Sequence, residues 1–445
     1  MKIFCCENST DQLTHQTRKL LQTTLSQFWG VSKDLGFSLR SSTDPKLVIS
    51  GGHMCGVHML NNLPDPGSQS YHIGGVARDM NGALVKAAGE THERYSQMIS
   101  EFVVSSEDKT FASYNELQTR GEPLLDFRYI DLFCPSQYSK QEFPFDSVKK
   151  TDSLGWIKFK NVIDGSLVWV PAQLSFLGYK PRRSQGEPVF GPSVTTGTAV
   201  HPDPKKAMLS AILELIQIDT AMGHWYGNSI AFRIQEDSRI RNLTKWLNQT
   251  LPKGRNRPEF YWLNNKRLPG FYIACIFRNQ LIRPKFSIGL GASMTLEDAL
   301  QKSFLEASGV NSLATVLCED QTKDQTDHFY DLDANVAYYA NGANEELLSE
   351  KFDVDQMIPS AELPSDITGS DAQAIKKIHE SFLQHNLNLL FYDLTSVEAR
   401  VSKLFVPRLW SPDLISLCLP SAPPKKHPGI KRYGGFQNLQ PHPYP

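Results

Sequence analysis

Three glutamates lie in similar surroundings along this chain. Glu90, Glu214 and Glu306 each follow an alanine by seven residues and a small residue by fifteen. Each also follows a polar residue by four positions: Lys86, Ser210 and Lys302. A small residue in a tight strand-to-helix connection, followed by a helix with one polar stripe, is a unit that can repeat around a common core. The pattern predicts a mixed α/β fold built from strand–helix pseudo-repeats, with a coincidence of three matches as the alternative.

Each of the three units predicts a helix with a polar face. In the middle unit, Asp203 is a good N-cap and Pro204 suits a first helical turn, so we expect a helix through residues 205–219. Its polar face carries Ser210, Glu214 and Gln217. The first unit has the polar stripe Lys86, Glu90, Glu93, Arg94 and Gln97. The third has Asp298, Lys302 and Glu306 after a Thr295-x-x-Asp298 capping signal.

Two interpretations of these stripes remain open. Most polar helix stripes are solvated faces with salt pairs between successive turns. These segments, however, are rich in alanine, glycine and aliphatic residues, as buried helices are. Buried carboxylates that converge on one place need cations, because uncompensated buried charge is costly. Oxygen ligands suit hard divalent ions, and Mg²⁺ held by carboxylates together with substrate phosphates is the commonest such arrangement.

Composition excludes several classes of protein. The 46 basic and 47 acidic residues give a net charge of −1, which offers no electrostatic attraction to nucleic acid or to an anionic membrane. No apolar stretch approaches the roughly 18 residues that span a bilayer, so we expect a cytoplasmic protein. The seven cysteines are scattered without a C-x-x-C pair, which argues against a disulfide framework and a structural zinc site. Walker, G-x-S-x-G and H-E-x-x-H motifs are absent.

Strand patterns lie between the helical units. Alternating or β-branched runs predict strands over residues 124–133 and 166–174, and a hairpin from residues 257–263 and 270–278. Residues 320–328 and 342–375 are acidic and polar, which favours a long surface loop with short helices. From residue 421 the chain turns to proline and basic residues, and we expect this end to form no core.

Specific motifs now carry a family resemblance. The run A-L-V-K-A-A-G-E-T-H-E-R-Y-S at residues 83–96, the T-T-G-T-A of residues 195–199 and the helix that ends E-L-I-Q-I-D at residue 219 together resemble the YcaO family. They look most like its SagD-like branch of cyclodehydratases, which form azolines in ribosomally made peptides. The final P-H-P-Y-P matches the P-x-P-x-P ending of azoline-forming members. The resemblance implies an N-terminal segment 1–50, a catalytic domain 51–420 and a proline-rich tail 421–445.

The resemblance also implies the site. The family's fold places carboxylates from three helices around ATP and Mg²⁺. Carried over by motif, the metal ligands would be Glu90, Glu93 and Glu214, and Pro445 would have a catalytic role through its carboxylate. The nucleotide contacts would be Lys86, Ser210, Gln217, Lys302 and Glu306. Three positions depart from the common family pattern, which are Lys86 in place of Ser, Gln217 in place of Glu and Gly309 in place of Gln.

The implied activity is ATP-dependent cyclodehydration of a precursor peptide, which turns Cys, Ser or Thr into thiazoline or oxazoline. Two alternatives stay open: a YcaO enzyme that forms thioamides, and a catalytically silent scaffold, which the three departures favour. Only fifty residues precede residue 51, so a ThiF-like partner protein is expected to recognise the leader peptide. A flavin-dependent azoline dehydrogenase is a further expected partner, and a homodimer is one possible assembly.

Overall fold

The strands form three sheets in the part of the chain that the structure, a computed structural model, describes. It describes residues 13–444 apart from 27–29, 40, 41, 43, 61–71, 193, 254–256, 280–282, 320–329 and 331. The first sheet has the order β1 (Ser32–Phe37), β2 (Val48–Met54), β3 (His72–Ala77). The second has the order β10 (Phe286–Ser293), β9 (Phe271–Arg278), β8 (Glu259–Leu263), β7 (Ala231–Gln235), β11 (Met357–Pro359). The third has the order β13 (Pro407–Trp410), β12 (Leu390–Asp393), β5 (Ser153–Asn161), β4 (Lys109–Ser113), and β6 (Leu167–Pro171) also pairs with β5.

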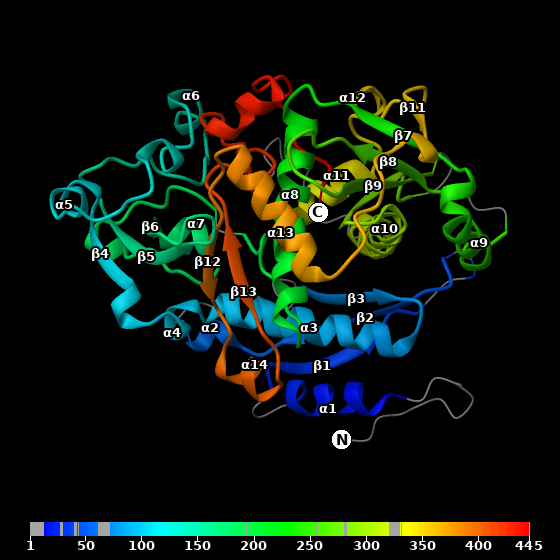
Figure 1. The fold of residues 1–445 in the computed structure, drawn as a ribbon, viewed down its shortest axis with the longest axis horizontal. Helices are drawn as coiled ribbons and strands as arrows, with labels where there is room; N and C mark the ends of the chain where they lie inside the picture. The colour runs from blue at the N-terminus through cyan, green and yellow to red at the C-terminus, as the bar shows by residue number, and fades with distance from the viewer. Residues whose placement is uncertain are drawn as a thin grey trace.

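Three long helices organise these sheets (Figure 1). They are α3 (Met80–Met98), α8 (Pro204–Tyr226) and α10 (Leu296–Glu319). Helix α3 packs on β2 and β3, α10 packs on β9 and β10, and α8 contacts β10 and β13 between the second and third sheets. The shorter helices are α1 (His15–Thr24), α2 (Val57–Leu60), α4 (Ser100–Val103), α5 (Tyr114–Thr119), α6 (Pro135–Tyr138), α7 (Ala172–Ser175), α9 (Arg241–Thr250), α11 (Leu332–Ala340), α12 (Glu345–Lys351), α13 (Asp371–Gln384) and α14 (Val397–Val401). The predicted mixed α/β class is confirmed.

Helix α8 begins where the sequence predicts and continues further. Asp203 caps it by accepting a hydrogen bond from the backbone N–H of Lys205 at 2.9 Å, and Pro204 occupies the first turn. The helix continues to Tyr226 because every residue from 218 to 226 is buried. A helical segment that is buried on all sides lies inside a core. The second half of α8 is therefore fixed by packing rather than by an amphipathic pattern.

The predicted repeat is confirmed in two of its three units. Gly75 lies in β3 and Gly291 lies in β10, rather than in the connections to the helices. A Cβ at Gly75 would lie 2.2 Å from the carbonyl oxygen of Ala83, and a Cβ at Gly291 would lie 2.3 Å from that of Ala299. The glycine therefore permits the same close strand–helix approach twice. In the middle unit Ala199 lies outside the named strands, so this unit differs from the other two.

The strand predictions fare unevenly. The expected hairpin forms, since β8 pairs antiparallel with β9. Strand β6 occupies part of 166–174, and the remainder begins helix α7. The predicted strand at 124–133 is wrong, because residues 127–129 form a 3-10 turn. Asp126 starts that turn by accepting the N–H of Arg128 at 3.0 Å, a local bond that competes with strand pairing.

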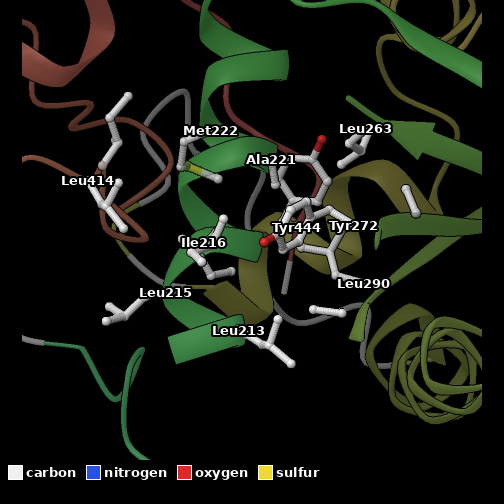
Figure 2. Close-up of a cluster of buried hydrophobic side chains, with 14 of the residues drawn as sticks. Leu213, Leu215, Ile216, Ala221, Met222, Leu263, Tyr272, Leu290, Leu414 and Tyr444 are labelled. Carbon is white, nitrogen blue, oxygen red and sulfur yellow. The ribbon is translucent and has the colours of Figure 1, made fainter. Parts of the chain in front are cut away.

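The proline-rich end departs from expectation, since it packs into the core. Ile430, Tyr433 and Tyr444 are buried in the same hydrophobic cluster as α8, and Figure 2 shows Tyr444 among side chains of that helix. The indole N–H of Trp225 donates to the carbonyl of Gln440 at 2.9 Å. Composition did not predict this packing, because it depends on a few aromatic residues of this end that pack against α8.

Three further expectations concern composition and loops. The described cysteines, Cys55, Cys134, Cys275, Cys318 and Cys418, are free thiols, and Cys5 and Cys6 lie outside the described residues. The stretch 342–375 contains α12, β11 and the start of α13, whereas 320–328 lies outside the described residues. Among the helices described, none combines the length and the apolar character that crossing a bilayer requires.

Candidate functional site

Two lysines occupy equivalent places in the repeated units. The Nζ of Lys86 on α3 donates to the carbonyl of Val76 in β3 at 2.7 Å. The Nζ of Lys302 on α10 donates to the carbonyl of Ala292 in β10 at 3.0 Å. Each lysine thus follows its acceptor by ten residues. An ammonium group has three donors, so each keeps donors for a further acceptor such as an anion.

Two glutamates are also held in equivalent ways. Glu90 accepts the backbone N–H of Gly74 at 2.7 Å, and Glu306 accepts that of Leu290 at 3.3 Å. Both pairs are separated by sixteen residues, and the donors lie in β3 and β10. Each strand therefore orients the carboxylate of the helix that packs on it.

The middle unit reaches a similar bond by a different route. Glu214 accepts the N–H of Gly197 at 3.1 Å, and Gly197 lies in a turn with a φ of +88°. A Cβ at this position would lie 2.3 Å from the carbonyl oxygen of Leu409. The turn therefore requires glycine for its backbone conformation and for its close approach to β13. This explains the glycine of the T-T-G-T-A motif.

The carboxylates of the three helices act on one another. Burial raises the pKa of Glu93 well above its ordinary value, and repulsion from Glu214 and Glu90 raises it further. Burial raises the pKa of Glu214 to about 7, although the hydrogen bond from Gly197 acts to lower it, and repulsion from Glu306 adds to the rise. Burial also raises the pKa of Glu306 to about 7, with Glu90 as a repelling neighbour. The structure thus gathers acidic groups of α3, α8 and α10 in one region.

The lysines belong to the same region. Burial lowers the pKa of Lys86, repulsion from Lys302 lowers it further, and Glu306 opposes both effects. Burial likewise lowers the pKa of Lys302, against the attraction of Asp298. Lys302 and Glu306 nevertheless remain exposed residues. Side chains that are accessible to solvent and still desolvated by surrounding protein atoms suit the binding of a polar ligand.

Arg94 and Gln97 extend the stripe of α3. The guanidinium group of Arg94 forms an ion pair with Glu90, with an Nη2–Oε1 distance of 2.8 Å. Gln97 is buried, and its amide donates to Thr198 while its carbonyl oxygen accepts the N–H of Leu177. The stripe therefore has two parts: Glu90 and Arg94 are half-buried, and Gln97 fastens α3 to the turn that contains Gly197.

Sequence reasoning missed Arg408. This arginine of β13 is 0% exposed, and its guanidinium group donates to the carbonyls of Ser175, Thr195 and Thr196 and to the hydroxyl of Thr198. Burial lowers its pKa to about 10, and the charges of Glu214 and Glu93 oppose that shift. Its Nη2 has no hydrogen-bond partner among the described residues. The available signal was an arginine inside the apolar run L-F-V-P-R-L-W, because buried charges are rare unless they are paired.

Two predicted residues are not part of this network. Ser210 is exposed and Gln217 is half-buried on α8, and neither side chain forms a hydrogen bond with another described residue. Pro445 lies outside the described residues, so its predicted role remains a prediction.

The donor set suits a divalent cation in chemical type. Among the described residues, no three acidic, histidine or cysteine side chains stand together as metal ligands. The carboxylates instead bond to backbone N–H groups and to Arg94. The raised pKa values of Glu93, Glu214 and Glu306 nevertheless show that burial and mutual repulsion make their charged forms unfavourable in the protein alone. A hard cation with oxygen ligands would relieve that repulsion, so the residues fit Mg²⁺.

Comparison with known families decides the family of this chain. A family model described as the ATP- and Mg²⁺-binding YcaO cyclodehydratase matches residues 74–410, which is more than half of the chain. This chain belongs to the YcaO family. The matched range contains all the candidate residues from Lys86 to Arg408. ATP and Mg²⁺ are accordingly the cofactors of this YcaO protein. No curated protein matches the sequence.

Solved structures share the fold at low sequence identity. A heterocyclase in complex with substrate and cofactor has a TM-score of 0.69 and 15% identity, covering 89% of this chain and 52% of its own. This YcaO protein thus spans about half the length of that heterocyclase. YcaO from Methanopyrus kandleri, bound with AMPPCP and Mg²⁺, has a TM-score of 0.56 and 15% identity over 89% of this chain and 88% of its own. The Escherichia coli microcin synthetase McbBCD complex with pro-MccB17 bound has a TM-score of 0.57 and 15% identity, covering 92% of this chain and 96% of the matched chain.

Proposed function

We propose that this YcaO protein is an ATP-dependent cyclodehydratase that converts Cys, Ser or Thr residues of a ribosomal precursor peptide into thiazolines or oxazolines. The observation that supports the proposal most is the equivalent arrangement of Lys86 with Glu90 and of Lys302 with Glu306, with Glu214 nearby. Ammonium groups bind phosphate oxygens, and the carboxylates suit Mg²⁺.

The proposed chemistry is activation of a backbone amide. A thiol or hydroxyl of the peptide attacks the preceding carbonyl carbon, and the amide oxygen becomes a hemiorthoamide oxygen. ATP supplies the γ-phosphoryl group to that oxygen, which then leaves as phosphate. The protein's task is to position the reactants and to neutralise charge.

Named residues have distinct roles in this proposal. Glu90, Glu93 and Glu214 would hold Mg²⁺, whereas Lys86, Lys302 and Glu306 would meet the phosphates. Ser210 and Gln217, which share a face of α8 with Glu214, would contact the nucleotide directly or through water. Arg408 would hold the turn that orients Glu214.

The terminal carboxylate has a proposed role of its own. Pro445 would place its carboxylate in the site, where it would order the peptide or assist proton transfer. We expect a protein extended by a few residues after Pro445 to bind nucleotide normally and to cyclise peptide far more slowly. Its thermal stability is the control. A wild-type rate of cyclisation in the extended protein would refute a role for this carboxylate.

Partners follow from the same proposal. A peptide substrate needs to be recognised away from the reacting residue, and a ThiF-like protein would bind its leader. A flavin-dependent dehydrogenase would oxidise the azoline to an azole. The proposed setting is the cytoplasm, where precursor peptides are made. A homodimer is the proposed assembly, and sedimentation of the purified protein tests it.

The central experiment compares carboxylate variants with a matched control. We expect Glu90→Gln, Glu214→Gln and Glu306→Gln each to lower cyclisation by orders of magnitude with little change in thermal stability, because the change acts on the transition state. Glu346→Gln is the control, since Glu346 is exposed on α12, away from this network. Normal cyclisation in the three site variants would refute the proposed roles.

Product analysis tests the reaction type. Each ring should release one ADP and one phosphate. Stoichiometric AMP and pyrophosphate would instead indicate adenylation. If the wild-type protein with precursor peptide and partner turns over no ATP, the chain acts as a silent scaffold and the proposal fails.

A further inference from the structure

A second polar region lies beside the C-terminal half of α8. It is a cavity of about 460 Å³ that forms where the turn after α8, the β8–β9 connection and the 3-10 helix η6 (Pro428–Tyr433) meet. Ligand pockets in proteins commonly have volumes of roughly 300–1,000 Å³. Its lining includes none of the residues assigned above to nucleotide or metal.

The floor of this cavity is an internally neutralised charge network. Asp219 is 1% exposed, and its Oδ1 accepts from Arg432 at 2.7 Å and from the N–H of Ile415 at 2.7 Å. Its Oδ2 accepts the hydroxyl of Tyr433 at 2.6 Å. The charge of Asp219 is therefore balanced by Arg432, and neither residue sets the net charge of the cavity.

The rim carries two cations without acidic partners. Lys266 and Arg267 are exposed residues of the β8–β9 connection, and neither forms an ion pair with a described residue. Their loop is ordered, because Asn265 accepts the backbone N–H groups of Arg267 and Leu268 at 3.0 Å. Asn265 also donates to Thr220 on α8 at 2.9 Å. The two positive charges therefore stand on a fixed loop and give the cavity an excess of positive charge.

Apolar side chains complete the lining. They are Ile230, Phe232, Leu268 and Leu387. Leu268 and Leu387 are buried, whereas Ile230 is 55% exposed and offers an apolar contact at the surface. A small ligand is usually buried over 70–90% of its surface. A cavity whose lining includes the exposed residues Lys266, Arg267 and Ile230 suits a segment of a longer chain, which continues into solvent at either end. The lining thus favours a segment that combines carboxylates with aliphatic side chains.

We propose that this cavity binds a short acidic and apolar segment of a peptide. The identity of that peptide as the precursor substrate rests on the proposed function. Asp219 follows Glu214 by five residues, which is about 7.5 Å along the helix axis and about 140° around it, so the two side chains lie on different faces of α8. An extended chain rises about 3.3 Å per residue. A peptide that reaches both places would pass around α8, so the cavity would supply a second point of attachment that is joined to the reacting amide by a connecting stretch of peptide.

The test measures fluorescence anisotropy of a labelled decapeptide that alternates Glu and Leu, with the full-length protein. We expect Lys266→Gln/Arg267→Gln to weaken binding about five- to tenfold. The matched control is Lys376→Gln/Lys377→Gln, which removes two exposed charges from α13 and should leave affinity unchanged. Ile230→Ser should weaken binding about threefold, because it removes the apolar contact.

Three results would overturn the proposal. The first is an unchanged affinity in Lys266→Gln/Arg267→Gln. The second is equal binding of a Gln–Leu decapeptide. The third is displacement of the acidic decapeptide by millimolar acetate or phosphate that is unaffected by Ile230→Ser, which would mean that the cavity binds small anions and not a peptide segment.

The experiment separates this proposal from the proposed function. Lys266→Gln/Arg267→Gln should bind ATP normally and should raise the KM for the precursor with little change in kcat. Unchanged KM with normal cyclisation would refute the cavity alone. Conversely, Glu306→Gln should still bind the acidic decapeptide, because Glu306 does not line the cavity. If the wild-type protein binds the decapeptide but does not cyclise the precursor, the proposed function alone is refuted.

Discussion

Replacement of Tyr444 tests whether the C-terminal end belongs to the folded core. Tyr444 is 0% exposed and lies among side chains of α8 (Figure 2). Its hydroxyl lies 3.2 Å from the Nδ1 of His224, and its ring stacks on His442 with 6.0 Å between centroids. Tyr444→Ala removes a buried aromatic ring, so it should cost about 3–5 kcal/mol of unfolding free energy. Tyr444→Phe removes only the hydroxyl, so it should cost about 1 kcal/mol.

The assay is denaturant unfolding, read as the shift in midpoint at unchanged slope. Leu439→Ala is the control, because Leu439 is 58% exposed on the same segment and its loss should cost under about 0.5 kcal/mol. If Tyr444→Ala is as stable as Leu439→Ala, the packing of this end against α8 is wrong. A large loss would also mean that deleting the last five residues tests folding rather than chemistry. Extension beyond Pro445 is then the sharper test of the terminal carboxylate.

Three further predictions concern the site and the repeat. The pKa values of Glu214 and Glu306 are both raised to about 7, so between pH 4.5 and 7 the folded chain binds more protons than the unfolded chain, and the unfolding free energy should fall as the pH rises through this range. Mg²⁺ with ATP should reverse the fall. Thermal unfolding at pH 5–8 measures both effects, and a stability that does not change with pH would contradict the burial of these carboxyls. Arg408→Lys keeps the charge but loses the planar donors to the backbone carbonyls, so it should lower the unfolding free energy by about 2 kcal/mol and weaken nucleotide binding, as measured by titration calorimetry. Wild-type stability together with wild-type affinity would mean that Arg408 has no positioning role. Gly291→Ala should lower the unfolding free energy by about 2 kcal/mol or more, because the added Cβ would clash with the backbone of α10. Gly36→Ala is the control and should be nearly neutral, because no atom lies within 4 Å of the added Cβ. Equal melting temperatures of the two variants in calorimetry would argue against the close packing at Gly291.

Local spacing made much of the fold predictable. The start of α8 could be predicted from Asp203 and Pro204, because capping depends on neighbouring residues. The two equivalent units could be predicted from glycines fifteen residues before Glu90 and Glu306, because close packing of a strand on its helix needs a small residue at one place. In contrast, the turn at 127–129 could not be predicted from alternation alone, since one side-chain bond from Asp126 decides it.

Tertiary structure decided the charge state of the site. The sequence placed glutamates on three helices, and the motifs around them carried the resemblance that implied the family and its cofactors. The pKa values of Glu214 and Glu306 depend on desolvation by elements far apart in the chain, and no local pattern contains that information. Arg408 reaches the turn at 195–198 only through the pairing of β13, some two hundred residues later.

The sequence by itself determined which residue types carry the chemistry and how each helix presents them, because helical periodicity and caps act over a few residues. Only the tertiary structure decided that the proline-rich end is core and that the cations of the β8–β9 connection stand beside the C-terminal half of α8. Burial and long-range charge are properties of packing, and they arise from contacts between segments that the chain brings together only when it folds.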